Sequence, residues 1–74
     1  LVYDLSDNVL VEGEIFDTVG KKIRTLFREN QSAGKKSVTW DGKNQDGMLV
    51  SAGVYYFRLS SNNLIESKKL LMVK

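Results

Sequence analysis

Turn-forming residues interrupt this chain of 74 residues at short and nearly regular intervals. Clusters of Gly, Asn, Asp and Ser separate short segments rich in Val, Ile, Tyr, Phe and Thr; the clusters are 6–8, 17–20, 30–34, 41–47, 51–53 and 60–63. Short β-branched and aromatic segments between turns are typical of a β-sandwich or barrel. Since each connection is short, neighbouring strands are expected to pair antiparallel. The sequence therefore predicts an all-β fold.

The segment from Val9 to Phe16 shows alternation with one apolar face. That face carries Val9, Val11, Gly13 and Ile15, and the other carries Glu12 and Glu14. A glycine on an inner face usually admits a large ring from the facing sheet or marks a bulge. We expect the ring of Trp40 to lie over Gly13.

Further strands are predicted along the rest of the chain. In the segment 21–27, Ile23 and Leu26 are three residues apart, so a strand places both inward only if it contains a bulge. The segment 36–41 turns Val38 and Trp40 inward. Later segments are predicted to place Tyr55, Phe57 and Leu59 on one face of 54–59, and to separate Leu71 and Val73 from Leu70 and Met72 in a last strand, 65–73.

Composition excludes several classes of function. The chain has no cysteine and no histidine, which rules out thiolate and imidazole metal sites and Cys–His or Ser–His relays. The net charge is +2, and the lysine pairs fall near strand ends, so no basic face for nucleic acid is expected. No apolar run is long enough for a membrane span. We expect no enzyme activity and no cofactor.

The loop from Asp41 to Gly47 is the first place to look for an ion site. An EF-hand is excluded, because Lys43 occupies the second ligand position and Ala52 the twelfth. We favour a tight loop held by side-chain hydrogen bonds of Asp41, Asn44 and Asp46, with weak calcium binding left open.

Two surface features are weighed against simple solvation. Glu12 and Glu14 are more plausible as solvated carboxylates than as a catalytic pair, because so small a domain offers no pocket to desolvate them. Tyr56 and Phe16 point away from the expected core, which leaves a strip for carbohydrate binding open.

The last segment is interpreted either as a recognition strand or as an edge strand protected by lysines. The candidate recognition strand is made of Ser67, Lys68, Lys69, Leu70, Leu71, Met72, Val73 and Lys74. A terminal edge strand is well placed to pair with a partner strand, but lysines on an edge also protect against such pairing.

Several segments together carry a family resemblance. They include an Ile-Phe-Asp-x-x-Gly stretch at 15–20, a Trp-Asp-Gly triplet at 40–42 and the stretch 51–59; the motif residues are Asp17, Gly20, Gly34, Trp40, Asp41, Gly42, Gly47, Gly53, Tyr55 and Leu59. Their order and spacing resemble the C-terminal sorting domains of type IX secretion in Bacteroidetes-type bacteria. They are also similar to the immunoglobulin-like domain of flagellar hook-capping proteins.

The resemblance implies an immunoglobulin-like antiparallel β-sandwich of about six or seven short strands, spanning residues 1–74 as one domain. It implies a C-terminal module that directs an upstream cargo domain to the cell surface or medium through the periplasm. The expected partners are then outer-membrane secretion machinery and a sortase-like protease. The alternatives are a carbohydrate-binding module of a surface hydrolase and a structural module of a hook-capping-type assembly protein.

Overall fold

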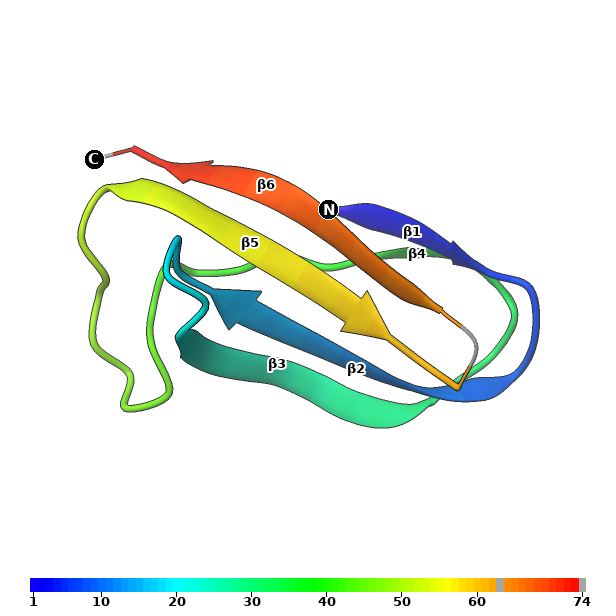
Figure 1. Cartoon of the computed structure of the whole chain (residues 1–74). Coiled ribbons are helices and arrows are strands. Elements are labelled where there is room, and N and C mark those ends of the chain that lie inside the picture. The colour runs from blue at the N-terminus through cyan, green and yellow to red at the C-terminus, as the bar shows by residue number, and fades with distance from the viewer. Residues whose placement is uncertain (63, 74) are drawn as a thin grey trace.

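The computed structural model describes residues 1–62 and 64–73, and strands and loops make up all of this part (Figure 1). The strands are β1 (Val2–Leu5), β2 (Val9–Phe16), β3 (Lys22–Gln31), β4 (Gly34–Ser37), β5 (Gly53–Ser60) and β6 (Ile65–Met72). Within the described part, no helix is long and apolar enough to cross a membrane.

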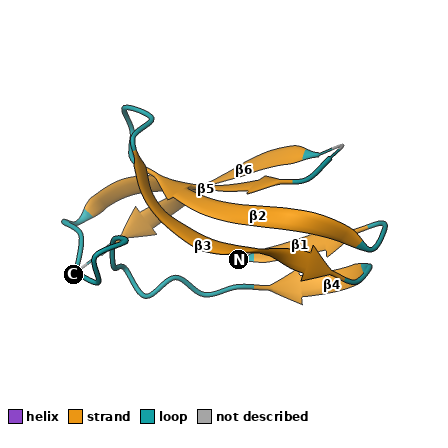
Figure 2. Cartoon of the chain, turned by 90° about the horizontal axis from the view of Figure 1, so that it is seen from below, coloured by secondary structure: helices purple, strands orange, loops and turns teal. Residues whose placement is uncertain are grey.

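The strands form two antiparallel sheets. The larger sheet has the order β3-β2-β5-β6, and β1 pairs with β4 in the smaller one. Figure 2 shows β1 and β4 lying along one face of the larger sheet. The predicted all-β sandwich is therefore confirmed, with six strands in the described residues.

The core lies between the two sheets and follows the alternation of the strands. The buried apolar side chains come from β1, β2 and β5; they are Tyr3, Leu5, Val11, Ile15, Tyr55, Phe57 and Leu59. Successive side chains of a strand point to opposite faces, so every second residue reaches this layer. The predicted inward faces of β2 and β5 are confirmed.

Gly13 accommodates two aromatic rings, but neither belongs to Trp40. A Cβ atom at this position would lie 2.5 Å from Phe27 Cε2 and 2.9 Å from Phe57 Cε1. The expectation that Trp40 fills this space is therefore wrong. Trp40 packs instead edge-on against Tyr55, with 5.3 Å between ring centroids.

Two register shifts in β3 explain its apolar spacing. Gly13 pairs with Phe27 and Glu14 with Thr25, which leaves Leu26 as an extra residue. A second shift between Ile15 and Phe16 leaves Ile23 extra. Ile23 and Leu26 both pack against the core, so the bulge predicted for this strand is confirmed.

The strand predicted over 36–41 is displaced toward the N-terminus. β4 ends at Ser37, where Leu1 and Val38 close its ladder with β1 through two backbone hydrogen bonds of 2.9 and 3.2 Å. Trp40 lies beyond the end of the strand, and its indole N–H donates to a carbonyl of the following loop. Val38 and Trp40 are nonetheless half-buried and Thr39 exposed, as the alternation predicts.

The β2–β3 turn has the predicted form. The amide of Gly20 donates to the Asp17 carbonyl at 3.2 Å, and Gly20 has a φ of 84°. This left-handed backbone conformation favours glycine because it has no Cβ. The turn therefore fixes the hairpin register through Asp17 and Gly20.

Candidate functional site

The predicted recognition strand lies at one edge of the larger sheet. β6 pairs with β5 along its whole length, and no other strand of the described residues pairs with its outer side. Ser67 to Met72 belong to β6, Val73 follows it, and Lys74 lies outside the described residues. The prediction of an edge strand is thus confirmed for 67–72, while its role in recognition stays a prediction.

The two faces of β6 carry the residues that alternation predicts, but they differ in exposure. Leu70 and Met72 are half-buried and pack against the core. Leu71 and Ile65 point outward and are 70% and 73% exposed. The strand is therefore not covered on both sides by the described chain.

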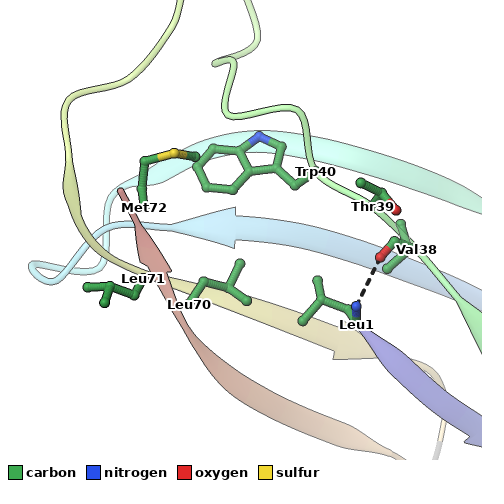
Figure 3. A pocket seen from close by; sticks show the side chains of 7 residues that line it. All are labelled: Leu1, Val38, Thr39, Trp40, Leu70, Leu71 and Met72. Atoms are coloured by element: carbon green, nitrogen blue, oxygen red, sulfur yellow. Dashed lines mark hydrogen bonds between the residues drawn. The ribbon is translucent and has the colours of Figure 1, made fainter. Parts of the chain in front are cut away.

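An apolar cleft opens beside the end of β6 (Figure 3). It has a volume of about 230 Å³ and is lined by Leu1, residues 38–40 and residues 70–72. Figure 3 shows the thioether of Met72 extending toward the Trp40 indole. The cleft lies where β6 and the 38–40 segment border the space between the sheets.

A lysine bridges the seam between the free edges of β6 and β1, further along β6. Lys68 Nζ donates to the Val2 carbonyl at 2.5 Å. Leu1 and Val38 exchange two backbone hydrogen bonds, so in the alternating ladder Val2 presents its carbonyl to the free side of β1. Lys68 therefore joins the edges of the two sheets and divides this seam from the cleft.

The opposite seam, between β3 and the smaller sheet, is occupied by the chain's own loop. The Gln45 amide donates to the Ile23 carbonyl at 3.1 Å, and the Gln45 side-chain oxygen accepts from the Thr25 amide at 2.9 Å. Arg24 Nη1 lies 2.7 Å from Asp41 Oδ1. The 41–47 loop thus supplies hydrogen bonds to the edge of β3 that a further strand would supply.

The same loop is held by internal hydrogen bonds of its polar side chains. Asp41 Oδ1 accepts from the Lys43 amide at 3.0 Å, and Asn44 Oδ1 accepts from the amides of Asp46 and Met48 at 3.0 Å. The hydrogen bond from Lys43, together with nearby Arg24, lowers the pKa of Asp41. The proposed side-chain capping is confirmed for Asp41 and Asn44, whereas Asp46 contributes its backbone amide.

The Trp-Asp-Gly triplet has a structural explanation at each position. Trp40 Nε1 donates to the Lys43 carbonyl at 2.9 Å, and Asp41 caps the loop as described. Gly42 has a φ of 78°, and a Cβ there would lie 2.7 Å from Met72 Cε. The triplet therefore connects the 41–47 loop to the end of β6. Among the described residues, no cluster of three acidic side chains could hold a metal ion.

The remaining motif residues lie in turns and in the core. Gly34, Gly47 and Gly53 have positive φ angles at turns or strand starts. Tyr55 is buried and donates its hydroxyl to the Ser51 carbonyl at 2.8 Å, and Leu59 is buried on the same face of β5. The turn and core positions of these motif residues account for them as structural residues.

Sequence reasoning missed the environment of Glu14. Its side chain is not solvated but buried, with 4% of the residue exposed. Arg58 Nη2 donates to Glu14 Oε1 at 3.0 Å, and Lys22 Nζ lies 3.4 Å from Oε2. Burial raises the pKa of Glu14, but the hydrogen bonds and charges of Arg58 and Lys22 outweigh it and lower the pKa overall. Arg58 lies opposite Glu14 in the β2–β5 ladder, and the sequence alone carries no signal of that pairing.

The aromatic strip weighed for carbohydrate binding is narrow in the structure. Phe16 and Tyr56 are direct cross-strand neighbours on the outer face. However, the Arg58 guanidinium covers the Phe16 ring, 4.4 Å from its centroid. Tyr56 is only 36% exposed. A flat platform for sugar rings is therefore not presented by this pair.

The chain matches the model of the FlgD Ig-like domain over residues 3–64. It is similar to the basal-body rod modification protein FlgD of Salmonella typhimurium and to that of Salmonella typhi, with 38% identity over 53 residues in each case. The aligned part covers 72% of this chain but spans only 23% of each relative. No solved structure matches. These matches support the hook-capping side of the resemblance, while the type IX sorting side stays a prediction.

Proposed function

Because the chain belongs to the FlgD Ig-like domain family, we propose that it is a non-catalytic structural module of a hook-capping-type assembly protein. The match over residues 3–64, which covers β2 to β5 and most of β1, is the observation that carries this proposal. The module's role is to contribute a rigid packing surface to its parent protein.

The loop end of the sandwich supplies a suitable packing surface. The 17–20 turn and the 41–50 loop lie at the same end, on the left in Figure 1. They expose three large apolar side chains: Val19 is 85% exposed, Met48 64% and Leu49 66%. Exposed apolar side chains that gather on one part of a surface are typical of a site that packs against another protein.

The proposal is tested in the parent protein in its source bacterium. The double variant Met48→Ser/Leu49→Ser is expected to reduce the number of assembled hooks seen by electron microscopy, with unchanged amounts of the parent protein. Ile65→Ser serves as the matched control, because Ile65 is also an exposed apolar residue but is the first residue of β6, and this strand starts at the other end of the sandwich (Figure 1). Normal hook assembly after replacement of the whole domain by an unrelated Ig-like domain would overturn the proposal.

A second candidate function is favoured by the position of β6. The last described strand is an edge strand with outward Ile65 and Leu71, as a segment read by another protein requires. In this case the domain directs an upstream cargo through the periplasm to the cell surface or medium, with outer-membrane secretion machinery and a sortase-like protease as partners.

The second candidate is tested by export of a reporter. The reporter is fused ahead of residues 1–74 in a host with type IX secretion, and reporter activity is measured in the medium. Export is expected to require the domain and to fall when Ile65 and Leu71 are both replaced by Lys. Export of the reporter without the domain would exclude this function.

A further inference from the structure

We propose that the free edge of β6 binds an extended peptide segment of one pattern. The inward side chains of this peptide are apolar where they lie opposite Leu70 and Met72, and acidic where they lie opposite Lys68. The binding mode is addition of a strand to the sheet edge, with the apolar side chains entering the cleft beside Trp40. This inference concerns a site away from the 41–50 loop tips and does not depend on the assembly role.

The backbone argument comes from the contrast between the two seams. The edge of β3 receives a backbone amide and a side-chain amide from Gln45, which imitate the hydrogen bonds of a neighbouring strand. On the outer side of β6, no described strand or loop does the same. An edge strand with unpaired amides and carbonyls is a template for strand addition.

The side-chain argument follows from alternation along β6. Lys68, Leu70 and Met72 share the inward face, because their partners in β5 include the buried Phe57 and Tyr55. A strand added outside β6 places its own inward side chains next to these three. Leu70 and Met72 line the apolar cleft of about 230 Å³ at this end of β6.

The charge argument sets which peptide fits. Lys68 uses its ammonium group for the Val2 carbonyl, and an ammonium carries three donors, so two remain for a carboxylate. Glu66 lies two residues further on the same face and lines the seam together with Asp4 and Lys68. A second acidic residue opposite Glu66 would be repelled. The site therefore selects one acidic residue followed by alternating apolar residues, rather than an acidic tract.

The test uses the 74-residue chain and two blocked synthetic peptides, Asp-Thr-Val-Thr-Val and its reverse, Val-Thr-Val-Thr-Asp, to allow for either strand direction. Binding is followed by amide NMR shifts and by the fluorescence of Trp40, the single tryptophan. One of the two peptides is expected to shift amides of residues 68–73 and the Trp40 indole. Absence of shifts at millimolar peptide, or shifts confined to other strands, would overturn the proposal.

Two charge-reversal variants separate this site from general attraction to lysine. Lys68→Glu is expected to weaken binding of the acidic peptide by about fivefold, as for the loss of an exposed ion pair. The variant should bind a peptide in which Lys replaces Asp more tightly. Lys69→Glu makes the same change of net charge on the opposite face of the strand and should leave the affinity nearly unchanged. Equal weakening by both variants would show that net charge alone governs binding.

A milder variant and a blocked peptide complete the test. Lys68→Gln removes the charge and keeps a side-chain N–H donor on the same face of β6 as the Val2 carbonyl. It should weaken the acidic peptide and not discriminate between Asp and Lys. A peptide N-methylated at both its threonines and its valines cannot donate backbone hydrogen bonds to β6 from these residues in either strand direction and should lose binding. Unchanged binding of the methylated peptide would exclude strand addition.

Discussion

The Phe27 ring occupies the place where Gly13 would carry a side chain. Phe27 Cε2 and Cζ each lie 2.5 Å from the position of a Cβ atom on Gly13, and the two residues are direct partners in the β2–β3 ladder. The ring also lies against Tyr3 and Phe57, with centroid separations of 6.2 and 6.4 Å. A missing side chain on β2 therefore makes room for an aromatic cluster.

Gly13→Ala is expected to destabilise the domain by about 1–3 kcal/mol, because the added methyl group overpacks this site. Phe27→Leu alone should also destabilise it through lost packing. The double variant should be less destabilised than the sum of the two, since the smaller side chain leaves room for the methyl group. Urea unfolding measures each free energy, and strict additivity would show that Gly13 and Phe27 do not compete for space.

The sequence predicted the strand faces well because alternation is a local property. Val11, Ile15, Phe57 and Leu59 are buried where the period of two places them. The bulge in β3 was also predictable, since Ile23 and Leu26 have a spacing that a regular strand cannot place on one face. The turn at 17–20 was likewise predictable, because its motif depends only on the local backbone conformation.

Contacts between distant segments were not predictable in the same way. The contact of Gly13 with Phe27 rather than Trp40 depends on the register shifts in β3 and on the packing of the two sheets, which the spacing of residues does not encode. The burial of Glu14 depends on Arg58, which is 44 positions away in the chain. The seam between β6 and β1 arises only when the two sheets pack together.

Replacement of Glu14 by Gln should change the dependence of stability on pH. The pKa of Glu14 is lowered from its ordinary value of 4.5, so its ionised form stabilises the fold above that pH. This contribution is lost as the pH falls through the lowered pKa. Glu14→Gln should therefore destabilise the domain by about 1–3 kcal/mol at pH 7, and by less at pH 3.

Glu12→Gln is the matched control for this experiment. Its carboxylate lies 3.6 Å from Arg28, and a third of its side chain is exposed. An ion pair of this kind contributes at most about 1 kcal/mol. Urea unfolding between pH 3 and pH 7 measures both variants, and a difference for Glu14→Gln that stays constant with pH would contradict the assigned role of Arg58 and Lys22.

Gly42 and Gly47 offer a matched pair of positions with similar backbone angles. Their φ angles are 78° and 82°, so alanine is strained at both by about 1–2 kcal/mol. Only at Gly42 does a Cβ approach Met72, with 2.7 Å to Cε, whereas nothing lies within 4 Å at Gly47. Both variants should lose similar stability, because the end of a methionine side chain moves easily.

The two glycine variants should differ in the cleft. Gly42→Ala is expected to shift the ¹³C-methyl NMR signal of Met72 and the fluorescence of Trp40, since the thioether must move along the indole. Gly47→Ala should leave both signals in place. An unshifted Met72 signal in a folded Gly42→Ala variant would show that the triplet does not connect the loop to β6.

Leu70 and Leu71 test the two faces of the edge strand. Leu70→Ala should destabilise the domain by about 2 kcal/mol, because Leu70 packs against the core. Leu71→Ala should change the free energy of unfolding by no more than about 0.5 kcal/mol, since Leu71 is 70% exposed. The two substitutions remove the same atoms from adjacent positions, so strand propensity and the unfolded chain contribute almost equally to both.

A loss of stability for Leu71→Ala as large as that for Leu70→Ala would mean that the outer face of β6 is covered in solution. Analytical ultracentrifugation would then test whether a second copy of the chain covers it. A sedimentation coefficient that rises with protein concentration would identify self-association.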